Sequence, residues 1–290
     1  MFFEILTKVF EMQVAASELV TIHTIERCAI LTLHHPKSLN SLVPGMLTDL
    51  LAKLMKASND IETDALILTG AGKGFCSGAN LSGNHLRDKA GEIEQSIKDE
   101  LNPVILAIRN CPKPTFAAIN GAAAGAGVGL AMACDFCVVE ESAKLILSFA
   151  KIGAVLDAGT SHFIQEALGS KRALHLAITG TPVTGSEAVE WGLAQFRAVD
   201  GESTLTAISI AKAISRNSPA SVRTIKWMLR QTQNLNLEDA LDLEAKCQGL
   251  AFQTQNFREG IDGFQRGKQP NFSASEANAI ISQLTDCETK

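Results

Sequence analysis

The chain has 290 residues, of which 46% are hydrophobic and 20% charged, so it can bury a sizeable core and is neither disordered nor collagen-like. Its 26 Lys and Arg are outnumbered by 31 Asp and Glu, and the resulting net charge of −5 argues against nucleic acid as a partner. The longest run of small apolar residues, 122–134, contains three glycines and is shorter than the roughly 20 residues of a membrane-spanning helix. We therefore expect a globular enzyme or binding protein that works away from the membrane.

The seven cysteines are an odd number without the spacing of a disulfide framework, which is typical of reduced thiols in a cytoplasmic protein. Cys134 and Cys137 form a C-x-x-C pair inside an apolar run, where we expect them to pack in the core. The histidines show no metal-ligand spacing, so no metal site is predicted. Residues 1–17 carry charges among their apolar residues and are interpreted as an N-terminal leader rather than a secretion signal.

Strands and helices alternate along the first part of the chain. Hydrophobic periodicity predicts a hairpin of residues 19–26 and 28–33, a helix over 44–58, a strand over 65–69, a helix over 93–109, and strands over 115–119, 136–139 and 145–148. After residue 159 helices dominate, over residues 161–168, 171–178, 186–191, 203–216, 219–230 and 237–253. The pattern predicts an α/β core of βαβ units over residues 18–200, followed by a helical C-terminal region over residues 201–290.

Two glycine-rich turns follow predicted strands, at residues 70–81 and 120–130. Each turn can expose consecutive backbone N–H groups, and the second leads into a helix whose N-terminus carries unpaired donors. Neither turn matches a Walker A or G-x-G-x-x-G motif, so a nucleotide-binding loop of those kinds is disfavoured. Alone, each is more often just a turn.

Taken together, the motifs resemble those of the enoyl-CoA hydratase/isomerase (crotonase) superfamily. The resemblance runs in order from about residue 19 to 272, and rests on the segments 73–81, 112–115, 120–127, 134–135, 142–144, 151–153, 192–193 and 258–268. It implies a spiral of ββα units, a helical C-terminal region that forms trimers or dimers of trimers, and an acyl-CoA thioester as substrate. It implies no cofactor beyond the CoA moiety of that substrate.

The resemblance also implies two backbone N–H groups that grip the thioester oxygen, and by position these belong to Ala79 and Ala126. Preorganised donors of this kind are each worth about 3 kcal/mol of barrier when an enolate oxygen develops negative charge. Hydratases of the family carry two glutamates, which correspond here to Gly129 and Phe149. Because both carboxylates are missing, hydration by the two-glutamate route is not expected.

Asp157 offers a different acid/base group. The stretch that contains it is similar to the subgroup of phenylacetate-pathway epoxyphenylacetyl-CoA isomerases and to some enoyl-CoA isomerases, in which this aspartate acts as the base. We expect Phe149, Leu156 and Phe163, together with Gly129, to line the substrate pocket and to exclude water from the carboxylate. The residues alone leave another interpretation open, because Asp157 precedes a helical run and could serve as its N-cap or as an Asx-turn.

Five residues are candidates for binding the CoA nucleotide: Lys37, Asn40, Ser77, Phe264 and Lys268. Lys268 is suited to phosphates as a point charge. His85 follows the first glycine turn and is a further candidate for contact with the substrate.

Three functions remain open on the sequence alone. The first is isomerisation of an unsaturated or ring-containing acyl-CoA with Asp157 as acid/base. The second is dehalogenation or hydrolysis of an acyl-CoA with Asp157 as nucleophile, since family dehalogenases also pair such an aspartate with glycine at the position of Gly129. The third is a non-catalytic subunit that retains the fold.

Overall fold

The structure is a computed structural model that describes residues 18–82 and 90–288 and places their strands in two sheets. The larger sheet has the order β1 (Val20–Ile25), β2 (Cys28–Leu33), β3 (Ala65–Gly70), β5 (Thr115–Ile119), β7 (Phe136–Glu140) and β10 (Phe196–Ala198). The smaller sheet has the order β4 (Gly74–Cys76), β6 (Ala122–Ala124), β8 (Lys144–Ile146) and β9 (Val183–Thr184).

Successive strand pairs build the spiral that the sequence predicts. β3, β5 and β7 pair in parallel in the larger sheet, and β4, β6 and β8, which follow each of them, pair in parallel in the smaller one. All residues of β3 and β5 are buried, as expected for parallel strands covered on both faces. The predicted crotonase-like α/β fold is thus confirmed.

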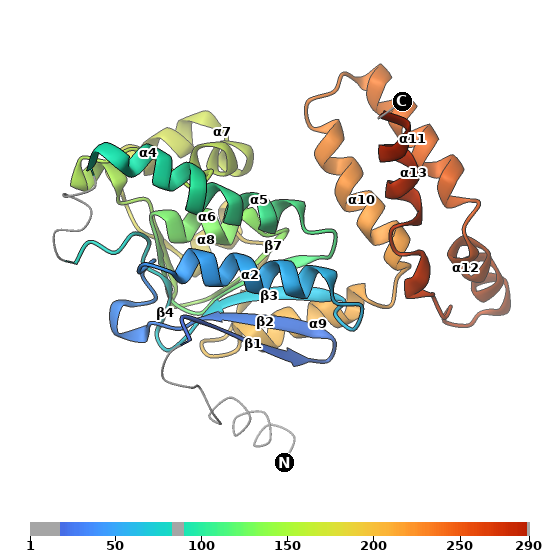
Figure 1. The fold of residues 1–290 in the computed structure, drawn as a ribbon, viewed down its shortest axis with the longest axis horizontal. Coiled ribbons are helices and arrows are strands. Elements are labelled where there is room, and N and C mark those ends of the chain that lie inside the picture. Colours follow the sequence, from blue (N-terminus) through green and yellow to red (C-terminus); the bar gives the residue numbers. More distant parts are fainter. Residues whose placement is uncertain (1–17, 83–89, 289–290) are drawn as a thin grey trace, which may run out of the picture.

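Helices cover both faces of the larger sheet (Figure 1). One layer contains α2 (Met46–Asn59), α5 (Asn102–Asn110), α6 (Ala126–Ala133), α7 (Thr160–Thr179) and α8 (Gly185–Trp191). α5 is preceded by α4 (Ile93–Ser96) and a π-helical turn (Ile97–Leu101), which together fill the helix predicted over residues 93–109. On the other face, α9 (Ser203–Ile214) packs Ala207, Ile208 and Ala211 against apolar side chains of the sheet.

Several features differ from the sequence-based expectation. α9 packs on the sheet, although the expected helical C-terminal region began at residue 201. The short strands β4, β6, β9 and β10 were missed because segments of two and three residues are too short to show a strand period. The helices after residue 253 were also not predicted. The residues 161–178 form one helical run with a break at Gly169, where φ is 68° and ψ 165°.

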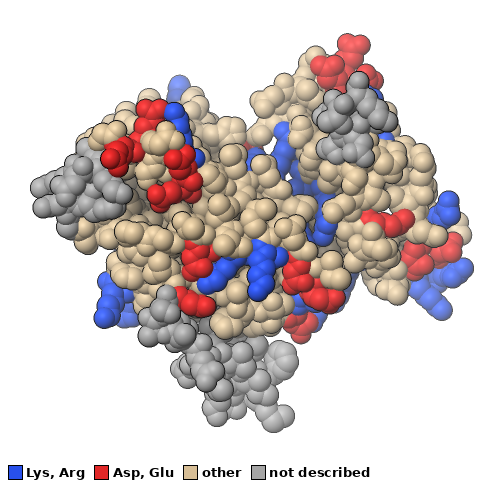
Figure 2. Space-filling view, viewed as in Figure 1, with Lys and Arg blue, Asp and Glu red and all other residues tan. Residues whose placement is uncertain are grey.

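The remaining helices form a C-terminal arm beside the core (Figure 1). The arm consists of α10 (Pro219–Thr232), α11 (Leu237–Ala251), α12 (Gln255–Arg266) and α13 (Ala279–Glu288). A cavity of about 730 Å³ lies between the core and the arm, and basic residues including Arg27, Lys113 and Arg223 contribute to its lining. Figure 2 shows basic side chains in the hollow between the two parts.

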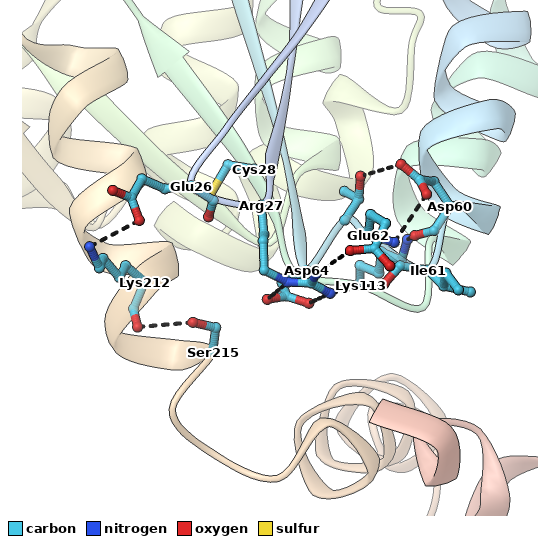
Figure 3. A network of polar contacts seen from close by, with 11 residues as sticks. Glu26, Arg27, Cys28, Asp60, Ile61, Glu62, Asp64, Lys113, Lys212 and Ser215 are labelled. Atoms are coloured by element: carbon cyan, nitrogen blue, oxygen red, sulfur yellow. Dashed lines mark hydrogen bonds and ion pairs between the residues drawn. The ribbon is translucent and has the colours of Figure 1, made fainter. Parts of the chain in front are cut away.

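A network of polar contacts joins the β1–β2 turn to the elements around it (Figure 3). Arg27 binds Asp64 at 2.9 Å and Glu62 at 2.7 Å, both in the loop after α2. On the other side of the turn, Glu26 binds Lys212 of α9 at 3.0 Å. The Glu26–Lys212 contact further attaches α9 to the core.

Asp135 attaches the arm to the core. It follows α6 and accepts hydrogen bonds from Thr115 N at 2.8 Å and Thr115 Oγ1 at 2.9 Å. Its two carboxylate oxygens also pair with Lys226 and, at 2.6 Å, with Arg230, both from α10. The side chains of all three ions are largely buried, so removing one charge leaves the others without compensation.

None of the helices in the described part of the chain is long and apolar enough to cross a membrane.

We predict that Asp135→Asn lowers the free energy of unfolding by about 3 kcal/mol, because it leaves two largely buried cations unpaired. Urea denaturation measures this change. The control is Glu141→Gln, which removes an exposed partner of Arg197 3.4 Å away and should cost less than about 1 kcal/mol. Equal effects of the two substitutions would contradict the role given to Asp135.

Candidate active site

The two glycine-rich turns come together where β4 and β6 end. Gly74 pairs with Ala122 and Cys76 with Ala123, so the chain leaves both strands in the same direction. A Cβ atom built on Gly78 would lie 2.6 Å from Ala124 O and 3.3 Å from Ala126 N. Only glycine permits this approach, and Gly78 also has φ of +81°, a left-handed backbone that favours glycine.

Ala79 and Ala126 each bring a backbone N–H to this junction. Leu42 N donates to Gly78 O at 2.8 Å, and in the parallel bridge between Leu42 and Ala79 the N–H of Ala79 points away from Leu42. Ala126 is the first residue of α6, where an N–H has no partner within the helix. Within residues 18–82 and 90–288, neither amide donates a hydrogen bond, so both are available to a ligand.

Two asparagines hold the first turn in place. Asn40 Nδ2 donates to Ala71 O at 3.0 Å and Gly74 O at 2.7 Å, and Asn120 Nδ2 donates to Gly70 O at 2.7 Å and Gly72 O at 3.0 Å. The sequence analysis missed the role of Asn120, although a polar amide between a strand and a glycine turn was the available signal. Since these bonds fix the turn that precedes Ala79, both asparagines preorganise its amide.

Asp157 does not cap the helix that follows it. The N-cap of α7 is Gly159, and it makes no side-chain capping bond. It is the backbone carbonyl of Asp157 that accepts, from Thr160 N at 2.9 Å and Thr160 Oγ1 at 2.7 Å. The interpretation of the Asp157 carboxylate as a helix cap is therefore wrong, and the side chain is left without that structural task.

The Asp157 carboxylate is instead poorly hydrated and unpaired. Among residues 18–82 and 90–288, its Oδ1 atom is buried without a hydrogen-bond partner, and burial raises the pKa of the carboxyl group above its ordinary value of 3.8. α6 carries no charged residue, and the charged groups near the start of α7 bind elsewhere. Lys151 donates to Gly180 O at 2.8 Å, and His162 lies 3.8 Å from Glu166. A buried acid with a raised pKa is typical of a catalytic proton carrier.

The predicted pocket residues gather around Ala126 and Asp157. The ring of Phe149 lies 3.7 Å from the Cβ position of Gly125, and Phe163 packs on Gly159. Leu156 is half-buried beside them. Gly129 requires a correction: its Cβ position is 2.5 Å from Ala158 Cβ, so protein rather than open pocket covers it. Ala158 thus places Asp157 next to α6, one helical turn from Ala126.

The expected CoA-binding residues fall into three groups. Lys37 is exposed, and Ser77 lies in the first turn with its Oγ donating to Ser38 O at 2.7 Å. Asn40 is a correction, because its side chain is 0% exposed and its Nδ2 and Oδ1 atoms are bonded to backbone groups. Phe264, 84% exposed, belongs to α12 and Lys268 follows it, so both lie on the arm, away from β4 in the same chain (Figure 1). His85 lies outside the described residues.

No cluster of three or more metal-ligating side chains occurs in the part of the chain that the structure describes. Cys134 and Cys137 are both free and buried, and burial raises the pKa of the Cys137 thiol to about 12. Thiols that stay protonated at neutral pH are poor nucleophiles and poor metal ligands. Their packing in the core is confirmed.

Comparisons with known proteins agree with the fold. Residues 24–275 match the family model described as Enoyl-CoA hydratase/isomerase. The chain is 32% identical over 259 residues to 1,2-epoxyphenylacetyl-CoA isomerase of Escherichia coli (strain K12). The alignment covers 88% of this chain and 98% of that protein. It is also 32% identical over 246 residues to enoyl-CoA hydratase ACTT3 of Alternaria alternata, covering 84% and 82% of the two chains.

Among solved structures, an enoyl-CoA hydratase from Polaromonas sp. JS666 superposes with a TM-score of 0.83 at 28% identity, over 88% of this chain and 99% of that one. The chain belongs to the enoyl-CoA hydratase/isomerase family. Membership makes it an acyl-CoA enzyme, and its relatives include both hydratases and isomerases.

We predict that Asp157→Asn becomes more stable relative to the native protein as pH rises. The pKa of Asp157 is raised in the folded state, so the native protein loses stability from about pH 3.8 up to that raised pKa, and the loss persists at neutral pH. Asparagine carries no charge and escapes this loss. Urea denaturation at about pH 3.5 and pH 7.5 measures the difference. The stability of the variant minus that of the native protein is compared at the two pH values. If this difference falls from acid to neutral pH, the carboxylate has a stabilising partner, which would contradict the prediction.

Proposed function

We propose that this protein is an enoyl-CoA isomerase-type enzyme that moves a double bond, or opens a ring, in an acyl-CoA through an enolate. The observation that carries the proposal is the carboxylate of Asp157, buried on one oxygen, unpartnered and adjacent to α6. No cofactor beyond the CoA moiety of the substrate is required.

The reaction needs two things from the protein. The amides of Ala79 and Ala126 donate to the thioester oxygen and stabilise the negative charge that grows there when a carbon-bound proton leaves. Asp157 takes the proton from C2 or C4 and returns it to the other carbon, which relocates the double bond with one group acting as base and then as acid. Burial favours this cycle, because a raised pKa makes Asp157 a stronger base and makes its protonated form persist.

Hydration is disfavoured by the same residues. Addition of water requires groups that hold and deprotonate it, and the family's two glutamate positions are Gly129 and Phe149 here. Gly129 is covered by Ala158, and Phe149 is an apolar ring. Neither residue can hold a water molecule for attack on a double bond.

A second candidate uses Asp157 as a nucleophile in dehalogenation or hydrolysis of an acyl-CoA. The unpartnered carboxylate favours it as well, since an ionised and poorly hydrated oxygen is reactive toward an electrophilic carbon. The two candidates differ in the intermediate. The nucleophile forms an aryl ester on Asp157 with loss of halide, or a mixed anhydride with loss of the CoA thiolate, whereas the base forms no covalent bond.

The arm suggests how the site is completed. Apolar side chains are exposed along α10 and α11, among them Ile225, Leu229, Leu237 and Leu241. Ile225 and Leu241 also line a cavity of about 530 Å³ in the arm. Exposed apolar surface of this extent suits contact with another protein surface. We propose a homotrimer or dimer of trimers, in which Phe264 and Lys268 of one subunit join Lys37 and Ser77 of a neighbour at the CoA nucleotide. The free, buried cysteines support a cytoplasmic location.

We predict that the protein exchanges deuterium from solvent into C2 or C4 of 3-enoyl-CoA while converting it to 2-enoyl-CoA, and that Asp157→Asn lowers kcat by about 1000-fold. Absorbance and mass spectrometry of a panel of 2-enoyl, 3-enoyl, phenylacetyl-derived and halobenzoyl thioesters measure this. Asp200→Asn, at an exposed position between β10 and α9, is the control and should keep full activity. Mass labelling of Asp157 would favour the nucleophile instead, and failure to bind any acyl-CoA would indicate a non-catalytic subunit.

We predict a native mass of three or six times the chain mass of 30.9 kDa in light scattering. Leu229→Glu places a charge on the exposed apolar face of α10, and it should shift the population toward the monomer. Leu174→Glu changes an equally exposed leucine on α7 and should leave the mass unchanged. A native protein that runs as a monomer would contradict the proposed assembly.

A further inference from the structure

We propose that Ala158 is a positioning residue for the acid/base group. Ala158 has a left-handed backbone and packs directly on Gly129, which holds Asp157 beside α6 with its carboxylate free. The same contact excludes a second acid/base side chain from position 129. This inference rests on the proposed function and identifies the residue that determines where its proton carrier lies.

The contact between Gly129 and Ala158 is direct and leaves no free space. A Cβ atom on Gly129 would lie 2.4 Å from Ala158 O and 2.5 Å from Ala158 Cβ, closer than Cβ atoms approach other atoms in proteins. Gly129 is three residues after Ala126 on α6, so the two lie on neighbouring positions of one helix face. Ala158 therefore contacts α6 one helical turn from the amide of Ala126, which is proposed to bind the oxyanion.

The backbone of Ala158 is strained. Its φ is +51°, in the region that side chains with a Cβ atom disfavour, and Gly159 follows with φ of +72°. Helix capping does not require alanine here, because Gly159 is the N-cap and makes no side-chain capping bond. A glycine at position 158 would adopt the same backbone without strain. Strain of this kind persists where the surrounding structure enforces it, and it is concentrated at functional sites.

The methyl group of Ala158 is what a glycine would lack. Ala158 is 2% exposed and belongs to the main apolar core cluster, which includes Ala126 and Phe149. Removing this methyl group opens space between α6 and the Asp157 segment. Water entering that space would hydrate the carboxylate, whose isolation from solvent is the cause of its altered acidity.

The position of Asp157 is fixed on both sides by backbone contacts. Thr160 N and Oγ1 bind the Asp157 carbonyl, and Ala158 rests on α6. In the described part of the chain no charged group binds the carboxylate: α6 carries none, Lys151 is bound to Gly180 O, and His162 lies 3.8 Å from Glu166 on α7. The placement of Asp157 therefore depends on the backbone contacts made by Thr160 and Ala158.

The same contact determines which chemistry the fold allows. A glutamate at position 129 cannot be accommodated without displacing the Ala158 carbonyl and methyl group, and with them Asp157. A site with Ala158 seated on Gly129 therefore has one proton carrier and no water-holding pair. Residues 129 and 158 together select proton relocation over hydration.

The test is Ala158→Gly. The variant should fold with near-native stability, since glycine accepts this backbone, and its kcat should fall about tenfold while KM stays within about twofold of the native value. The acid limb of the pH profile should move toward the ordinary aspartate value as water reaches Asp157. Glu26→Gly is the matched control, because Glu26 also has φ of +50° but lies in the β1–β2 turn beside α9 (Figure 3). It should leave kcat and the pH profile unchanged.

A second measurement separates this inference from the proposed function. The pKa of the Asp157 carboxyl group, followed by carbon-13 NMR in the substrate-free protein, should be lower in Ala158→Gly than in the native protein. That result supports the positioning role even if no acyl-CoA is isomerised, an outcome that would overturn only the proposed function. An unchanged pKa, or a lowered pKa with full isomerase activity, would overturn the positioning role.

Discussion

The site depends on the parallel pairing of β4 with β6. These strands have three residues each, and their register brings the two glycine turns into contact, with Gly78 against Ala124 and Ala126. Backbone amides can serve as donors at a fixed point only if the strands before them are fixed, because an amide has no rotamers of its own. Asn40 and Asn120 extend this rigidity by binding the carbonyls of the first turn. The glycines are thus required by close approach rather than by flexibility.

Two unfavourable features lie next to each other beside α6. Asp157 has a buried carboxylate oxygen without a partner among the residues that the structure describes, and the next residue, Ala158, has a left-handed backbone that costs about 1 kcal/mol or more. Asp135, by contrast, is paired with Lys226 and Arg230, and the buried Glu140 carboxylate accepts hydrogen bonds from Ser203. A buried acid without such a partner is a candidate for chemistry.

Much of the fold and the outline of the site follow from the sequence. Short apolar runs located β3 and β5, helical periodicity located the helices up to α11, and the glycine motifs located the two turns. Three kinds of information were out of reach. Strands as short as β4, β6, β9 and β10 have no readable period. The role of Asp157 could not be separated from capping, because an acid before a helix has the same sequence in both cases. What distinguishes them is that α7 begins at Gly159 without a capping bond from a side chain. The covering of Gly129 by Ala158 is a contact between distant segments, which no local pattern reports.

The most direct measurement is a crystal structure of Asp157→Asn with a bound unsaturated acyl-CoA, a variant that should hold its substrate without converting it. We expect the thioester oxygen within about 3 Å of both the Ala79 and Ala126 nitrogens, and the side chain of residue 157 facing C2 and C4 of the acyl group. A thioester oxygen that contacts neither amide, or a residue 157 that faces away from the acyl chain, would contradict the enolate mechanism.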